Sequence, residues 1–323
     1  MRTLSKTQLD DEYLIYKTLT PGKRYKTYLA MKADSTGNPH SVILKEMDEK
    51  RAHIYFSLES MWNPYLPDTY DVFQLVEPAD PKQNCYVAVT EYVSANGSPE
   101  EECLSLTQFV YKHGPLTDTT SLSICAQICE GLKEFHEKGF VHRDLKPDNI
   151  MIAEYHLESP KIKVIDFGGA KHQNPNGNAD TTVIGTLGYQ PPESLSSRAT
   201  NRADIYSVGC ILNFMLTGQE PGIKVYRGKH SIERIIEKAT NIDPSYRYKS
   251  ILSMKRDIEH ELRTTLWDKI PISPLDYDRA SHTCDIHFSS VFLPLHRCSA
   301  TGFYWKMVGS VQSKMLDDHR AGY

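Results

Sequence analysis

The sequence predicts an α+β protein in two parts, a small antiparallel sheet followed by a mainly helical part. The chain has 323 residues, enough for one two-lobed domain and a tail. Residues 13–93 contain short runs in which apolar and polar residues alternate, separated by turn residues, as in half-buried strands. From 94 to 265, apolar residues recur instead at three- and four-residue steps, which is typical of helices that bury one face. Residues 266–323 form a tail to which we assign no role.

Three segments define the predicted sheet. From Tyr13 the text YLIYKTLTPGKRYKTYLAMK has a strand–turn–strand pattern. Ser41–Lys45 (SVILK) gives the next strand. Cys85–Val93 (CYVAVTEYV) is apolar enough to be a buried strand that runs out into a connector.

Helical periodicity marks the second part at Ser105–Tyr111 and again at Thr119–Glu137. The longer helix should end at Lys138-Gly139, because glycine is common just past a helix C-terminus. Cys125 and Cys129 lie four residues apart on it, and we expect both to be small core residues. Amphipathic segments near the end of this part predict two helices that close the domain.

Composition narrows the classes of function. The net charge of −4 and the lack of a basic block argue against nucleic acid or an anionic membrane surface as partner. The longest apolar run, Val208–Leu216, is too short to cross a bilayer. The N-terminal MRTLSKTQLDDEY lacks the apolar centre of a signal peptide. Seven cysteines at irregular spacings do not make a secreted disulfide framework. We therefore expect a cytoplasmic protein.

Two motifs in the second part carry the functional signal. Phe140–Ile152 (FVHRDLKPDNIMI) sets polar residues between two apolar runs, which predicts a tight loop between short buried strands. Its spacing fits H-R-D-L-x-x-x-N, and D-F-G follows at Asp166. Together the motifs resemble the protein kinases. Lys146-Pro147 and GTLGYQPPE (Gly185–Glu193) resemble the serine/threonine branch, and the closing helices look most like those of bacterial members. The resemblance covers about 13–262.

The resemblance implies a two-lobed protein-kinase-like fold that uses ATP and Mg²⁺ to phosphorylate serine and threonine hydroxyls of proteins. Asp144 is the predicted base that accepts the proton of the substrate hydroxyl, and Lys146 is placed to reach the transferring phosphoryl group. Thr186 would bridge Asp144 and Lys146. Asn149 and Asp166 offer the hard oxygen ligands that suit Mg²⁺.

The same resemblance assigns nucleotide-binding residues in the first part. Lys45 ends its strand as in V-A-I-K and should hold the α and β phosphates. Ile43 stands where a small residue usually contacts the adenine. The phosphate-covering hairpin departs from the family pattern: with Thr27 in the position that covers the base, Gly22 is the only glycine of three. Tyr25, at the tip, could cap the site or block it.

Further predicted contacts come from the connector. Thr90 would lie behind the adenine, and the backbone of Glu91 and Val93 would hydrogen-bond the base. Met151, in the apolar run after the catalytic loop, is counted with the nucleotide-binding residues.

The glutamate that normally pairs with the phosphate-binding lysine has no clear counterpart. Counting back from Pro64 in the landmark NPYLPDTYDVF falls near Ile54, where no acid is present. Glu49 and Glu59 are the two candidates. We favour Glu59, because apolar residues beside it could pack inward, although either could be a solvated helix charge.

Other residues are assigned to regulation and support. Arg143 precedes the base, and in the family this arginine pairs with a phosphate on the activation loop. Thr181 and Thr182 are the candidate phosphorylation sites. By the same resemblance, Asp204 hydrogen-bonds the backbone of the catalytic loop from beneath. The second support is Arg247, which resembles the arginine that pairs with Glu193.

Two rival functions remain open at this point. One is a pseudokinase that binds a nucleotide or a partner without turnover, favoured by the incomplete glycine hairpin, by Ile43 and by the unclear identity of the glutamate. The other is a small-molecule kinase of the aminoglycoside type, which lacks a segment like GTLGYQPPE. A zinc site in the tail is conceivable but fits no standard finger spacing. Its candidate ligands are His282, Cys284, His287, His296 and Cys298.

Overall fold

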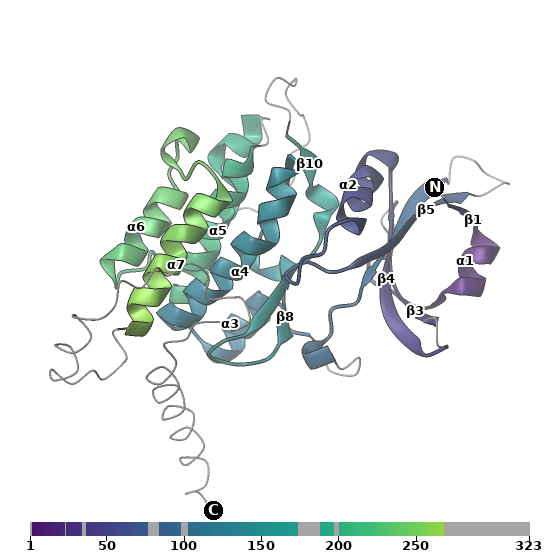
Figure 1. Ribbon diagram of the computed structural model, residues 1–323, viewed down its shortest axis with the longest axis horizontal. Coiled ribbons are helices and arrows are strands. Elements are labelled where there is room, and N and C mark those ends of the chain that lie inside the picture. Colours follow the sequence, from purple (N-terminus) through teal and green to yellow (C-terminus); the bar gives the residue numbers. More distant parts are fainter. Residues whose placement is uncertain are drawn as a thin grey trace, which may run out of the picture. The chain divides into compact units, whose positions relative to one another are not determined.

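The computed structural model describes residues 2–22, 24–33, 37–76, 84–97, 103–173, 188–196 and 200–267. The chain divides into two units, Met1–Ile270 and Pro271–Tyr323. All described residues belong to the first unit, whose helices and strands are labelled in Figure 1. The cysteines and histidines of the predicted tail lie outside them.

The first part is a six-stranded sheet with the order β1-β5-β6-β4-β3-β2. Neighbouring strands run antiparallel, as the sequence predicted, except that β1 is parallel to β5. The strands are β1 Thr3–Ser5, β2 Leu14–Thr18, β3 Thr27–Ala33, β4 Pro39–Met47, β5 Thr69–Val76 and β6 Cys85–Glu91. Strand β1 lies before residue 13, the predicted start of this part, so the sheet extends further toward the N-terminus than the sequence indicated.

The two faces of this sheet are covered by different helices. Alternation along β4 turns Val42 and Leu44 to one face and Ile43 and Lys45 to the other. The first face packs in a cluster that includes Leu9 of helix α1 (Lys6–Glu12). The second face meets helix α2 (Glu49–Glu59), which lies on the other side of the sheet in Figure 1.

The second part is mainly helical, as predicted. Helix α4 packs along α5 and α7, and two small sheets, β7 with β10 and β8 with β9, frame the loops that carry the motifs. The elements are η2 Ala95–Gly97, α3 Leu106–His113, α4 Asp118–Glu137, β7 Phe140–Val141, η3 Pro147–Asn149, β8 Ile150–Glu154, β9 Lys161–Val164, η4 Phe167–Gly169, β10 Lys171–His172, η5 Pro192–Ser196, α5 Asn201–Thr217, α6 His230–Ala239, η6 Pro244–Tyr246 and α7 Ile251–Trp267.

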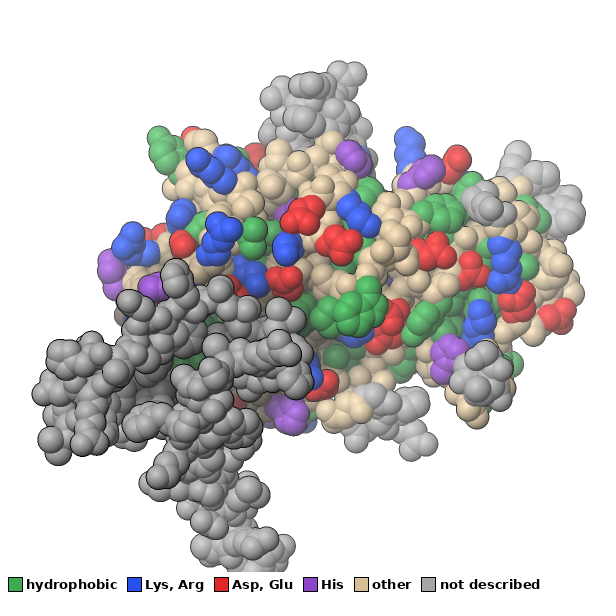
Figure 2. Space-filling model, viewed as in Figure 1, with side chains coloured by type: hydrophobic (Ala, Val, Ile, Leu, Met, Phe, Trp, Pro, Cys, Tyr) green, Lys and Arg blue, Asp and Glu red, His purple; other side chains and the backbone are tan. Residues whose placement is uncertain are grey.

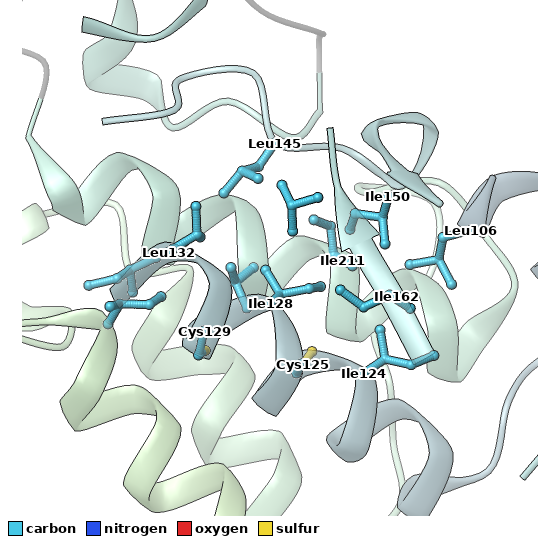
Figure 3. Packing of buried hydrophobic residues seen from close by; sticks show 14 of the residues in the cluster. Leu106, Ile124, Cys125, Ile128, Cys129, Leu132, Leu145, Ile150, Ile162 and Ile211 are labelled. Carbon is cyan, nitrogen blue, oxygen red and sulfur yellow. The ribbon is translucent and has the colours of Figure 1, made fainter. Parts of the chain in front are cut away.

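Helix α4 is the centre of the core. Figure 3 shows its inward side chains, among them Cys125 and Cys129, packed against aliphatic residues of neighbouring elements. Both cysteines are fully buried and unpaired, which confirms that they serve as small core residues. The helix ends at Glu137 with Lys138 as its C-cap, and Gly139 follows with φ of +81°. Glycine adopts this left-handed conformation without strain, so the chain can turn directly into β7.

A short segment after α2 joins the two parts. The Asn63 side chain donates a hydrogen bond of 3.2 Å to the Glu130 carbonyl of α4, and the Val164 N–H donates one of 2.8 Å to the Tyr65 carbonyl. Gly131 permits this close approach, because a Cβ there would lie 3.2 Å from Cβ of Tyr65. The sheet is therefore fixed to the helix that leads into the catalytic loop.

Side chains of both charges are interspersed over the described part of the face shown in Figure 2. This agrees with the small net charge of −4. Among the described residues, no helix is both long enough and apolar enough to cross a membrane.

Leu9→Ala should destabilise the protein by about 2–4 kcal/mol, because it removes a buried side chain from the sheet face that α1 covers. Urea unfolding measures the change. Asp10→Ala on the exposed side of the same helix is the matched control and should change stability by less than about 0.5 kcal/mol. Equal effects of the two substitutions would mean that α1 does not pack on the sheet.

Candidate active site

The catalytic loop is held by one buried carboxylate. Asp204, in the first turn of α5, accepts hydrogen bonds from the backbone N–H of His142 at 2.8 Å and of Arg143 at 2.9 Å. His136 lies 2.7 Å away through Nε2. Burial alone would raise the pKa of Asp204, but the hydrogen bond and charge of His136 lower it below its ordinary value. The expectation that Asp204 supports the loop from beneath is confirmed.

Three polar side chains predicted for the reaction come together in this loop. The Lys146 ammonium lies 3.6 Å from an Asp144 carboxylate oxygen. The Asn149 amide donates to the Asp144 backbone carbonyl at 2.7 Å and lies 3.3 Å from its carboxylate. Because Asn149 donates through its nitrogen, its amide oxygen is left as the acceptor of that side chain. Thr186 lies outside the described residues.

The D-F-G segment lies directly against the catalytic loop. The Ile165 N–H donates to the Asn149 carbonyl at 2.8 Å, and the next residue, Asp166, has a left-handed φ of +65°. Phe167 is buried and packs between the rings of Phe135 and His142, with centroids 5.2 and 5.0 Å away. This packing fixes the direction of the Asp166 side chain.

Lys45 connects the sheet to this segment. Its Nζ lies 3.3 Å from an Asp166 carboxylate oxygen. Lys45 is the largest influence on the pKa of Asp166 and lowers it, against the opposing effect of burial, so the carboxylate is ionised at neutral pH. Burial alone would lower the pKa of Lys45, but the neighbouring Tyr55 hydroxyl and Asp166 raise it above its ordinary value.

These groups fit Mg²⁺ bound with a nucleotide. Asp166 supplies an ionised carboxylate and Asn149 an amide oxygen from adjoining backbone. Within the described ranges, no three His, Cys, Asp or Glu residues gather as a protein-only metal site. A magnesium ion that shares its coordination with phosphates needs only one or two protein oxygens.

The sheet register groups several of the predicted nucleotide contacts. Thr27 pairs with Lys45 across β3 and β4, and Ile43 pairs with Thr90 across β4 and β6. Residues directly opposite each other share a face, so these side chains belong to the face that carries Lys45. Val93 is buried just after β6.

The remaining predicted contacts lie near the connector. The Glu91 N–H donates to the Asp68 carbonyl at 2.8 Å, and its side chain forms an ion pair with Lys163 of β9. Met151 is half-buried in β8, opposite Lys163. Glu91 thus ties the end of the sheet to the helical part.

The structure corrects the expected partner of Lys45. Neither Glu49 nor Glu59 lies against it, because α2 starts after its N-cap Asp48 and places the two glutamates at its two ends. Burial and the nearby Asp71 raise the pKa of Glu59, which is the opposite of what a lysine partner would do. The described carboxylate that pairs with Lys45 is Asp166.

Tyr55 occupies the place beside Lys45 that the glutamate was expected to fill. Sequence reasoning missed this residue, although the count back from Pro64 ended at its neighbour Ile54. That count identifies acids alone, so it gives no signal for a tyrosine.

Tyr25 is also placed differently from expectation. It packs against the cluster on the α1 side of the sheet, with Arg24 over its ring, and so lies on the face opposite Lys45. It therefore neither caps nor blocks the site. Gly22, with φ of +80°, gives the turn its left-handed residue, and the Thr20 hydroxyl accepts a hydrogen bond from the Thr27 N–H at 2.8 Å.

The second expected support is present. Arg247, only 2% exposed, donates to both carboxylate oxygens of Glu193 at 2.6 and 2.8 Å. Its Nε donates to the Asn241 carbonyl at 2.7 Å. A bidentate pair of this kind fixes the end of the GTLGYQPPE segment against the helical part.

Comparison with known proteins agrees with this architecture and site. A family model described as the protein kinase domain matches residues 34–272, well over half of the chain. The chain therefore belongs to the protein kinase family.

Its relatives include members from bacteria and a yeast. It is 35% identical over 163 residues to serine/threonine-protein kinase PknB of Mycobacterium tuberculosis, covering 49% of this chain and 24% of that protein. It is 30% identical over 255 residues to serine/threonine-protein kinase cds1 of Schizosaccharomyces pombe, and the match covers 73% of this chain and 51% of that protein. It is 28% identical over 259 residues to serine/threonine-protein kinase PknA of Nostoc sp., and the match covers 73% of this chain and 42% of that protein. The chain thus spans between about a quarter and a half of these relatives.

Asp204→Ala should lower the free energy of unfolding by about 3–5 kcal/mol, because three buried donors lose their acceptor. Chemical denaturation at pH 7 measures this. Asp257→Ala is the matched control: its carboxylate pairs with Lys238 at the surface, and its loss should cost less than about 1 kcal/mol.

The effect of Asp204→Ala should also depend on pH. Because folding lowers the pKa of Asp204, its contribution is present above the ordinary value of 3.8 and disappears as pH falls below it. The difference between wild type and variant should therefore shrink in acid. A difference that stayed constant through this range would contradict the assigned charge state.

Proposed function

We propose that this protein is an ATP- and Mg²⁺-dependent serine/threonine protein kinase, which transfers the γ-phosphoryl group of ATP to serine or threonine hydroxyls of protein substrates. The observation that carries the proposal is one continuous set of contacts. Lys45 pairs with Asp166, whose neighbour Ile165 bonds Asn149, which in turn holds Asp144 beside Lys146. The names of the relatives support the same activity.

In this proposal each residue performs one task. Asp144 accepts the proton of the attacking hydroxyl, and Lys146 offsets the negative charge that spreads over the transferring group. Asn149 and Asp166 hold Mg²⁺, which supplies charge neutralisation at the phosphates. Thr186 bridges Asp144 and Lys146.

The nucleotide itself is held from the sheet side. Lys45 orients the α and β phosphates. The remaining nucleotide contacts proposed are Gly22, Thr27, Ile43, Glu91, Val93 and Met151. Support comes from the shared face of Thr27, Ile43 and Lys45. Neither nucleic acid nor a particular oligomeric state is part of the proposal, and a cytoplasmic location stays a prediction.

Phosphorylation of the activation loop is proposed as the switch. The pKa of Lys171 is lowered, mostly by burial and to a smaller extent by three nearby cations, Arg143, Lys50 and Arg51. Lys50 and Arg51 also lie in the first turn of α2, where the helix dipole disfavours cations. A phosphate would relieve this repulsion. Thr181 and Thr182, outside the described residues, are the proposed acceptors.

Asp144→Asn should reduce phosphate transfer by at least about 100-fold while the affinity for ATP changes less than about threefold, because the base does not hold the phosphates. Incorporation of labelled phosphate from ATP into the protein and into a generic basic protein measures the first quantity, and equilibrium nucleotide binding the second. Asp148→Asn, an exposed acid in the same loop, should leave both unchanged.

These two measurements distinguish an active kinase from a pseudokinase and test the role of Asp144. Loss of ATP binding in Asp144→Asn would show that Asp144 is not the base. A wild type that binds ATP but transfers no phosphate would indicate a pseudokinase.

Mass spectrometry of the active enzyme should find phosphate on Thr181 or Thr182, and Asp144→Asn protein made alone should lack it. Lys171→Glu should reduce activity of the phosphorylated enzyme, because it removes a cation from the cluster that includes Arg143. Active enzyme with neither threonine modified would contradict regulation through these residues.

A further inference from the structure

The Tyr55 hydroxyl is a buried polar group without a hydrogen bond of standard geometry. The side chain comes from the middle of α2 and is 2% exposed. The hydroxyl has no hydrogen-bond partner of standard geometry among the described residues. A buried hydroxyl in this state costs free energy, so its presence calls for an explanation beyond packing.

Its surroundings indicate what it faces. The hydroxyl lies next to the Lys45 ammonium, the Asp166 carboxylate and the backbone N–H of Phe167. Helix α2 also contacts η4, the segment that starts with Phe167. All three neighbours belong to the site described above.

Lys45 needs an acceptor that the rest of the site does not provide. An ammonium group has three donors, and burial without acceptors disfavours its charged form. Among the described residues, the acceptor within hydrogen-bond distance of its ammonium is a carboxylate oxygen of Asp166, 3.3 Å away, and Asp166 is also a proposed ligand of Mg²⁺. Neither Glu49 nor Glu59 reaches Lys45.

We propose that the Tyr55 hydroxyl positions Lys45 for the nucleotide phosphates, in the role that the family resemblance gives to a glutamate of this helix. The inference rests on the proposed kinase function of the site. A tyrosine hydroxyl can accept from two donors and donate once. It can therefore accept from Lys45 and from the Phe167 N–H while it donates to Asp166. Catalytic hydrogen bonds are often long without substrate and shorten in the complex.

This anchor is neutral, whereas a glutamate would bring a negative charge. A tyrosine phenol, with an ordinary pKa of about 10, is protonated at neutral pH. Lys45 then keeps its full charge for the phosphates, while its position is fixed by a dipole.

Tyr55→Phe tests the proposal because it removes only the hydroxyl. Stability should stay within about 1 kcal/mol of wild type or rise, since that hydroxyl has no hydrogen bond to lose. The kcat for phosphate transfer should fall about tenfold, as expected when the hydrogen bond that Lys45 would donate to Tyr55 in the nucleotide complex cannot form, while KM for ATP changes less than about threefold. The adenine contacts still hold the nucleotide, so positioning suffers more than binding.

Tyr13→Phe is the matched control. Tyr13 is also a fully buried tyrosine of the sheet part, and its hydroxyl also faces a lysine, accepting from Lys32 at 3.2 Å. Its substitution should leave kcat unchanged. If Tyr55→Phe kept wild-type kcat, or if it lost stability and activity together, Tyr55 would be a packing residue only.

A second measurement does not depend on turnover. An acyl-phosphate derivative of ATP labels a lysine that lies against the phosphates, and peptide mass spectrometry gives the rate at Lys45. Tyr55→Phe should slow this labelling about tenfold relative to wild type and Tyr13→Phe. If wild type transferred no phosphate, the proposed function would fail, and the labelling rates would still decide the role of Tyr55. Equal rates of labelling at Lys45 in wild type, Tyr55→Phe and Tyr13→Phe would overturn the proposal that Tyr55 positions Lys45.

Discussion

The buried carboxylate of Asp204 is the interaction on which the active-site geometry depends. A charge with no exposure is stable in a protein interior only when donors surround it, and two of its donors are backbone N–H groups of the catalytic loop, at His142 and Arg143. Arg143 has a left-handed φ of +68°, which is strained for a residue with a side chain. The same hydrogen bonds that satisfy Asp204 therefore hold the loop in a conformation that it would not adopt alone.

A backbone hydrogen bond and an ion pair connect this loop to the sheet. Asn149 bonds Ile165, and Asp166 then meets Lys45 from β4. The segment after α2 fixes the sheet to α4 independently, through Asn63 and its neighbours. Because two separate connections set the distance between the parts, the Lys45–Asp166 pair can form without carrying the docking itself.

Local chemistry explains which features the sequence could predict. Asp144, Lys146 and Asn149 lie within six residues, so their spacing alone brought them together, and the long periodic helix α4 was also predictable. The β1–α1 segment was missed because it is too short for a clear period and is stabilised by contacts with distant strands. The side of the sheet that Tyr25 covers depends on register, which a one-residue shift would reverse.

Tyr55 stands beside Lys45, where a glutamate was expected, and the sequence pattern did not indicate it either. A tyrosine in this place also changes how α2 is held. An acid at this position would bring a charge, whereas the role proposed for Tyr55 requires only an acceptor beside Lys45. Helix α2 is fixed by burial of Ala52, Ile54 and Leu58 beside Tyr55, and this apolar packing does not depend on attraction between charges. The first turn of the same helix instead carries Lys50 and Arg51 near Arg143. Packing thus sets the position of the helix. The cations near its N-terminus are the groups that could bind a phosphate on the activation loop.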